Sequence, residues 1–246
     1  MFPLKENTPQ YLFLIGFDDM IGNKFWYETH MHTSEVSRCA VNTAAEQVRA
    51  YKDRGYAGII ITDHFVNGYS TCPRNAPWDV RMKHIISGYT AAKTEGDILG
   101  LDVFLGWEFT VKGSDFLTYG LDLDFLVAHP RLDKLSVEKY SALVRENGGY
   151  IAQAHPYRDA YYIENKWPVD PKLLDGVEIF NASDSASSNK RALNFATEHD
   201  LSVQAGSDSH SVQNHFSSGI KLKQKAKNIH DIIEALKAKE VTLVLP

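Results

Sequence analysis

The chain has 246 residues, of which 43% are hydrophobic and 23% are charged, so it can form either one large α/β domain or two small ones. Its 26 Lys and Arg residues against 31 Asp and Glu give a formal net charge of -5, and the basic residues are scattered. This pattern argues against a broad nucleic-acid-binding surface, which needs positive charge. We therefore do not expect nucleic acid to bind, except as a single nucleotide.

The N-terminal sequence lacks the basic start and apolar stretch of a signal peptide, and no apolar run reaches the length of a membrane span. We therefore expect a cytoplasmic protein that does not cross a membrane. Cys39 and Cys72 are its two cysteines, and we expect both to be reduced thiols.

Apolar segments alternate with helical patterns along the chain. Residues 1–24 contain an apolar run and a turn, which predict a peripheral extension. A capping-box spacing at Thr43 and Glu46 predicts that a helix begins there and ends at Gly55. Further helices are predicted over 78–95, 137–147, 189–199 and 228–239, and strands over 24–29, 56–61, 101–106, 125–128, 150–154, 176–180, 201–206 and 241–245.

This alternation indicates βαβ units and a parallel sheet. Seven or eight strands are enough to close a barrel, in which active sites lie at the C-terminal ends of the strands. No linker, low-complexity tract or internal repeat interrupts the pattern. We predict a single α/β domain over 1–246, with 1–24 as its extension.

A His-Met-His stretch follows the first predicted core strand. Because side chains two residues apart on an extended segment point to the same side, His30 and His32 can reach one ion. Such a pair also occurs by chance, so its meaning depends on the segments that follow.

Polar residues able to bind a metal follow one predicted strand after another. Each alone suits a structural role, but together they predict a metal centre at one end of the barrel. Imidazole and carboxylate ligands suit zinc, manganese or iron, and eight ligands exceed what one ion needs. The eight are His30, His32, His64, Glu108, His129, His155, Asp208 and His210.

Several motifs together resemble the PHP (polymerase and histidinol phosphatase) superfamily over roughly residues 26–245. The resemblance implies a distorted seven-stranded β/α barrel that holds up to three divalent ions and hydrolyses phosphate monoesters, histidinol phosphate and nucleotides among them. The motifs are His30-Met31-His32-Thr33-Ser34 with Glu35, Ile61-Thr62-Asp63-His64, Gly106-Trp107-Glu108, Ala154-His155-Pro156-Tyr157-Arg158 and Gly206-Ser207-Asp208-Ser209-His210.

The resemblance also implies how the ligands are shared. One ion would take His30, His32, Glu108 and Asp208; a second would share Glu108 and add His129 and His155; a third would take His64 and His210. Many members of the family place Asp or His five residues after the second histidine, where this chain has Ser37. Glu35, Cys39, or substrate and water are the alternatives for completing that third site.

The expected reaction is hydrolysis of a small phosphorylated substrate, with the ions neutralising charge and lowering the pKa of a bound water from about 15.7 to about 7. We expect Glu108, Asp208 and Arg158 to be catalytic. Arg158 is the first choice for binding phosphate oxygens, because a guanidinium matches that group, with Arg191 and Arg38 behind it.

Two alternatives stay open. The chain could be a metal-binding module without turnover, like the inactive PHP domains of polymerases. It could also be an amidohydrolase-type metal hydrolase, since those barrels begin with the same His-x-His pattern. Asp63 and Glu178 are expected to orient an imidazole from outside the ligand set.

Overall fold

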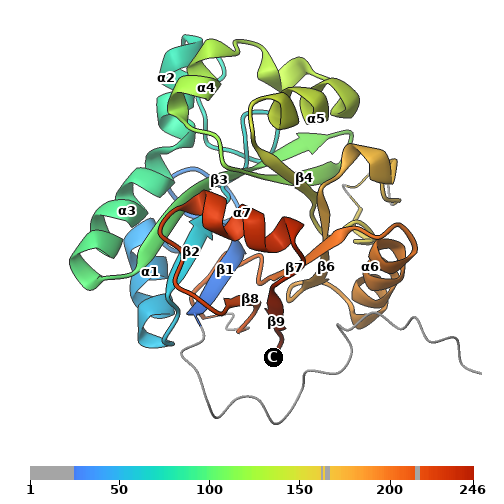
Figure 1. The fold of residues 1–246 in the computed structure, drawn as a ribbon. Coiled ribbons are helices and arrows are strands. Elements are labelled where there is room, and N and C mark those ends of the chain that lie inside the picture. Colours follow the sequence, from blue (N-terminus) through green and yellow to red (C-terminus); the bar gives the residue numbers. More distant parts are fainter. Residues whose placement is uncertain (1–24, 162, 164–166, 214–216) are drawn as a thin grey trace, which may run out of the picture.

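The computed structural model describes residues 25–161, 163, 167–213 and 217–246, which form a curled sheet surrounded by helices (Figure 1). The predicted N-terminal extension over 1–24 lies outside the described residues. The sheet has nine strands in the order β7-β6-β5-β4-β3-β2-β1-β8-β9. Their bounds are β1 Phe25–Met31, β2 Gly58–Ile61, β3 Asp102–Val111, β4 Ser114–Tyr119, β5 Tyr150–Gln153, β6 Gly176–Asn181, β7 Ser202–Gly206, β8 Gly219–Leu222 and β9 Thr242–Val244.

Strands β1 to β7 form a nearly closed barrel. β1, β2 and β3 are parallel to one another, as are β5, β6 and β7, while β4 runs antiparallel between the two sets. The sheet curls until β1 meets β7: Met31 pairs with Ser209 just beyond β7, and the Thr29 hydroxyl donates to the carbonyl of Ala205 at 2.8 Å. The predicted distorted β/α barrel is therefore confirmed.

Helices cover the outside of the barrel and one of its ends. α7 lies across the middle of the view in Figure 1 and packs through Ile232, Ile233 and Leu236 against residues such as Tyr119 and Tyr150 from the N-terminal end of the parallel strands. The opposite end is left for the polar residues. Helix bounds are α1 Ala44–Asp53, α2 Trp78–Ile85, α3 Ser87–Leu99, α4 Leu123–Ala128, α5 Val137–Glu146, α6 Ala186–Glu198 and α7 Ile229–Lys237, with short 3-10 turns at Leu132–Lys134 and Pro171–Leu173.

The predicted helix starts agree with the structure at both ends of the chain. Thr43 and Glu46 form the expected capping box of α1, and the Asn228 side chain caps α7. The single helix predicted over 78–95 is wrong, because the chain breaks at Ile86 into α2 and α3. Gly96 lies inside α3, beyond the predicted end of the helix, and lets α3 approach β3. A Cβ at this position would lie 2.6 Å from Val103 Cγ2.

The fourth strand of the barrel is not where the sequence pattern placed it. The predicted strand over 125–128 is part of α4, which begins where the Asp122 side chain accepts from the Phe125 amide at 2.9 Å. The barrel instead continues through a β3–β4 hairpin whose two turn residues, Lys112 and Gly113, have φ of 51° and 80°. Two consecutive positive φ values are characteristic of a tight type I′ turn, which fits the twist of paired strands.

The predicted strand at the end of the chain is β9, which pairs with the unpredicted strand β8 beside β1. Among the helices that the structure describes, none combines the length and apolar character needed to cross a bilayer.

Candidate metal centre

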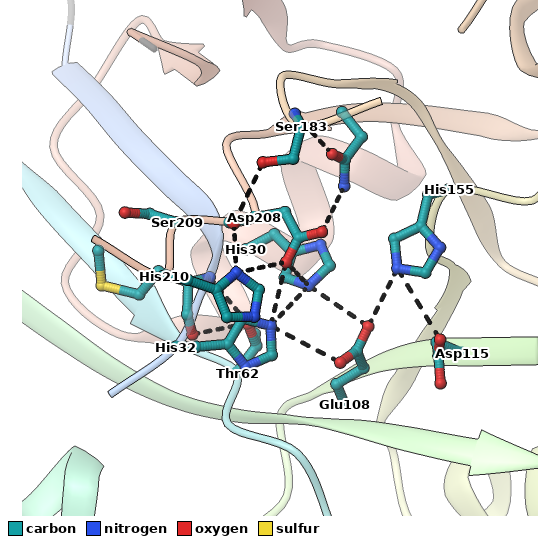
Figure 2. Close-up of polar contacts among 12 residues, drawn as sticks. His30, His32, Thr62, Glu108, Asp115, His155, Ser183, Asp208, Ser209 and His210 are labelled. Carbon is teal, nitrogen blue, oxygen red and sulfur yellow. Dashed lines mark hydrogen bonds and ion pairs between the residues drawn. The ribbon is translucent and has the colours of Figure 1, made fainter. Parts of the chain in front are cut away.

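Imidazoles and carboxylates converge at the C-terminal end of the parallel strands (Figure 2). The structure brings together seven of the eight predicted ligands in groups whose donor atoms lie within 4.8 Å of one another. One further carboxylate, Asp115, joins them, and it lies near the start of antiparallel β4. The groups are His30, His32 and Glu108; His30, His155 and Asp208; Glu108, Asp115 and His155; and His32, His64 and His210.

Four of these side chains lie close together, and the donor atoms of His30, His32 and Asp208 have the spacing of three corners of a tetrahedral ion site, with Glu108 beside both histidines. Ligand atoms about 2.05 Å from a zinc ion at tetrahedral angles are about 3.3 Å apart. The observed separations lie between 3.2 and 3.6 Å. They are His30 Nε2 to His32 Nε2 at 3.2 Å, His30 Nε2 to Glu108 Oε1 and to Asp208 Oδ1 at 3.4 Å each, and His32 Nε2 to Glu108 Oε2 at 3.6 Å and to Asp208 Oδ1 at 3.2 Å.

Hydrogen bonds fix which nitrogen of His30 faces this point. Its Nδ1 lies 2.9 Å from Glu178 Oε1, so Nδ1 donates to this carboxylate and, in the neutral imidazole, Nε2 keeps its lone pair. Glu178 is fully buried on β6 and also accepts from the His155 amide at 3.1 Å. Glu178 therefore positions both His30 and His155. Its contact with His30 is the kind expected of a residue that orients an imidazole.

Glu108 lies between the first group and a second one. Its Oε1 is 3.2 Å from His155 Nε2, and that nitrogen is 3.9 Å from Asp115 Oδ2. Glu108 belongs to β3 itself, which runs past the predicted end of this strand into the hairpin with β4. The same Oε1 lies 3.4 Å from His30 Nε2, and a carboxylate oxygen between the donors of two groups suits a bridge between two ions.

The third group contains His64 and His210. The Nδ1 atom of His210 lies 2.8 Å from the carbonyl of Asp208, so it donates there and its Nε2 is left to accept or bind an ion. Nε2 of His64 lies 3.2 Å from Cys39 Sγ, while its Nδ1 is 2.6 Å from Glu108 Oε2. Glu108 is thus in contact with residues of all three groups.

Burial and charge act against each other in this centre. Burial raises the pKa of Glu108, but His64 and the other neighbouring imidazoles outweigh it and hold that pKa well below its usual range. Burial likewise raises the pKa of Asp208, but the positive charges of His30 and Arg158 outweigh it and hold that pKa well below its usual range. Without an ion, protons supply the compensating charge: despite burial, the carboxylates raise the pKa of His30 and His64 well above the ordinary value.

Two of the clustered residues adopt backbone conformations that residues other than glycine seldom take. His155 has φ of 27° and Asp208 has φ of 53°. Both are held from several sides; the His155 amide donates to Glu178, and the Asp208 carbonyl accepts from His210. Strained residues of this kind cluster at functional sites, where the surrounding structure over-determines them.

His129 lies outside the centre. It follows α4, and its Nδ1 donates back to the carbonyl of Phe125 at 2.7 Å, capping the helix end. Its ring packs on Phe125, and it belongs to none of the close donor groups found in the described part of the chain. The expected position of His129 depended on a strand over 125–128, which is part of α4, and Asp115 lies beside Glu108 and His155 instead.

Arg158, the first choice for a phosphate-binding arginine, lies beside the centre. Its guanidinium donates to Asp208 Oδ2 at 2.7 Å and to Asn181 Oδ1 at 3.0 Å. A cavity of ≈ 10 Å³, space for about one water, is lined by Asp115, His155 and Arg158 among others. The other two candidate arginines make contacts elsewhere: Arg38 donates to the carbonyl of Ser70, and Arg191 stacks over Tyr157.

The sequence pattern did not indicate Asp115, because only residues that follow predicted strands were candidates. β4 is antiparallel to its neighbours, so its first residues, and not its last, lie at the C-terminal edge of the parallel strands. The signal was the short Lys112-Gly113 turn between two apolar runs.

Searches for similar proteins find structural likeness. No protein-family model matches the chain, and no curated protein matches it. Among solved structures, it resembles a two-domain protein from Bacteroides vulgatus ATCC 8482 that contains a predicted PHP-like metal-dependent phosphoesterase, with 16% identity and a TM-score of 0.68 over 91% of this chain. The chain spans 65% of that protein's length.

Two further solved structures have the same fold. One is an amidohydrolase from Chromobacterium violaceum with bound sulfate, with 15% identity, a TM-score of 0.55, and coverage of 89% of this chain and 98% of that one. The other is the lesion-specific endonuclease PfuEndoQ from Pyrococcus furiosus, with 13% identity, a TM-score of 0.58, and coverage of 90% and 58%. The chain therefore has the barrel fold of PHP-like proteins, which confirms the resemblance at the level of the fold.

Proposed function

We propose that this chain is a metal-dependent phosphoesterase of the PHP superfamily that hydrolyses a small phosphate monoester. The observation that carries the proposal is the cluster of His30, His32 and Asp208, whose donor atoms lie 3.2 to 3.4 Å apart like three corners of a tetrahedral ion site, with Glu108 beside both histidines. Fold likeness to a protein containing a PHP-like phosphoesterase supports it.

Two or three divalent ions, zinc, manganese or iron, would be held here. The first would take those four residues, the second Glu108, Asp115 and His155, and the third His64 and His210. When bound, such ions neutralise phosphate charge and acidify a water molecule, which supplies the nucleophile without a serine or cysteine.

The protein's own groups then bind and orient the substrate. Arg158 is the cation beside the proposed ligands, and its planar guanidinium suits phosphate oxygens. It is held by Asp208 and Asn181, so its position is fixed before substrate arrives. Glu178 keeps His30 in the tautomer that presents Nε2, and so preserves the donor set between turnovers.

The test is a phosphatase assay with manganese, zinc and iron against a panel of phosphate esters that includes histidinol phosphate and nucleotides. Glu108→Gln should abolish turnover and release metal while the circular dichroism spectrum stays unchanged, because the neutral amide removes a charge shared by two groups. A Glu108→Gln protein that keeps both metal and activity would contradict the proposal.

The amidohydrolase alternative is supported by the likeness to the Chromobacterium violaceum protein. An amide panel run beside the phosphate esters separates the two reactions, and faster turnover of an amide would favour this alternative. A metal-binding module without turnover would load ions yet hydrolyse neither panel.

A further inference from the structure

We infer that Cys39 provides a thiolate ligand to the third metal group and makes that group prefer zinc-like ions to manganese. The inference rests on the metal centre of the proposed function and adds a ligand to it. The Sγ atom of Cys39 lies 3.2 Å from Nε2 of His64. Cys39 also interacts with His210, so the sulfur lies beside two of the three histidines of this group.

The spacing suits an ion held by sulfur and nitrogen. With zinc–sulfur and zinc–nitrogen bonds of about 2.3 and about 2.05 Å, the two donors of a tetrahedral site are about 3.5 Å apart. The observed 3.2 Å between Cys39 and His64 is close to this edge. The imidazole of His210 has Nδ1 committed to the Asp208 carbonyl, which leaves Nε2 as the third donor.

Ser37 cannot take this role because its hydroxyl is already saturated. Oγ donates to Asp63 at 2.7 Å and accepts from the His64 amide at 3.0 Å, and Nδ1 of His32 lies 2.9 Å away. Glu35 is also engaged elsewhere: both of its oxygens lie 3.0 Å from the Ala44 amide at the start of α1. Of the residues considered for completing the third group, Cys39 is the one directed at it.

The loop between β1 and α1 holds Cys39 in place. The Arg38 amide donates to the Tyr69 carbonyl at 3.0 Å, and the Ala40 amide donates to the Ser37 carbonyl at 3.1 Å. Ser37 also pairs with Ser70 as an isolated β-bridge. The residues on both sides of Cys39 are therefore anchored, and the thiol is presented to the two histidines by a fixed backbone.

Ion binding at this group is an exchange of protons for metal. The Cys39 thiol loses its proton to buffer and the sulfur lone pair bonds to the ion, while the two imidazoles bind as neutral ligands. Thiolates favour zinc, cobalt and cadmium over manganese, which prefers oxygen. The group should therefore discriminate among ions more sharply than the oxygen-rich group of Glu108, Asp115 and His155.

Cobalt provides a direct spectroscopic test on the full-length protein. Cobalt(II) bound by a thiolate absorbs strongly in the near ultraviolet, and the chain has only two cysteines. We expect this band in the unmutated protein and in Cys72→Ser, and its loss in Cys39→Ser together with one cobalt equivalent. Absence of the band in the unmutated protein, or its persistence in Cys39→Ser, would overturn the inference.

Two further measurements guard against a folding defect in the variant. In the unmutated protein, zinc should protect Cys39 from alkylation, read by peptide mass spectrometry, and a chelator should restore its reactivity. Cys39→Asp should restore the third equivalent while shifting its preference toward manganese at least tenfold. Equal alkylation of Cys39 with and without zinc would overturn the inference.

The outcome is independent of turnover. A thiolate–cobalt band in a protein that hydrolyses no phosphate ester would contradict the proposed function and leave the ligand assignment intact. Full phosphatase activity with cobalt bound and no thiolate band would do the reverse.

Discussion

The Ser37 hydroxyl lies 2.9 Å from Nδ1 of His32, in a buried loop at the position where the resemblance to PHP proteins led us to expect a metal ligand. The single hydroxyl proton of Ser37 goes to Asp63, which accepts it at 2.7 Å. Because the serine oxygen is left as an acceptor, His32 must donate from Nδ1 and keep its Nε2 lone pair for the centre. The departure at Ser37 thus selects a histidine tautomer in place of binding an ion.

Ser37→Ala should weaken metal binding while leaving the fold intact. Without the acceptor, His32 can adopt either tautomer, and loss of such an orienting partner typically costs about 10-fold to about 100-fold in affinity. Competition with a zinc chelator measures the loss, with Ser34→Ala in the same loop as the matched control. Equal affinity in the two variants would show that Ser37 does not set the tautomer.

Asp115→Asn should remove tight binding at the second group. The amide oxygen is a weaker ligand than a carboxylate, and a negative charge beside Glu108 and His155 is lost. His129→Ala is the matched control, because the resemblance to PHP proteins implied that His129 belongs to this group and the structure places it at the end of α4. Metal content by mass spectrometry should fall by one equivalent in Asp115→Asn and stay unchanged in His129→Ala; the opposite result would restore the sequence assignment.

The protein without bound metal should lose stability as the pH rises above neutral. Burial lowers the pKa of His30 and His64, but the surrounding carboxylates raise it well above the ordinary 6.5. A raised histidine pKa stabilises the fold fully below the unfolded value, and this contribution is lost as pH rises through the folded value. The pKa values of Glu108 and Asp208 are lowered, so their contribution to stability is present above the ordinary values of 4.5 and 3.8. It is lost as pH falls through the lowered values.

Thermal unfolding from about pH 6 to about pH 9, with chelator or with zinc, measures this effect. Tm should fall with rising pH in chelator and fall less with zinc, because the ion replaces the protons on the imidazoles. Parallel curves would show that these histidines carry no linked protons.

Glu28→Ala should destabilise the protein by about 3 kcal/mol or more, because it leaves buried donors unsatisfied. The Glu28 Oε1 atom accepts from the amides of Thr29, His30 and Ser207 at 2.9 Å each, joining β1 to the loop of Asp208. Glu28→Gln keeps that oxygen and should cost about 1 kcal/mol. Urea unfolding of both variants tests this; equal losses would mean that the charge, and not the acceptor, is required.

The barrel and the positions of most of the clustered residues were predictable from the sequence. Parallel strands buried on both faces carry a continuous apolar signal, and a polar residue directly after such a strand falls at the C-terminal edge of the sheet whatever the loops do. His30, His64, His155 and Asp208 were therefore located from local pattern alone. Caps such as Thr43 and Asn228 are equally local, because their partners lie within three residues.

The remaining features depend on partners far apart in the chain, so the three-dimensional fold was needed to see them. The direction of β4 is set by pairing with β3 and β5, and it brings Asp115 into the centre while His129 stays at a helix end. Ser37 and Cys39 lie two residues apart in the chain, yet one orients His32 and the other faces His64. Which of two neighbouring polar side chains can reach an ion is fixed by hydrogen bonds across the fold, and no local pattern encodes them.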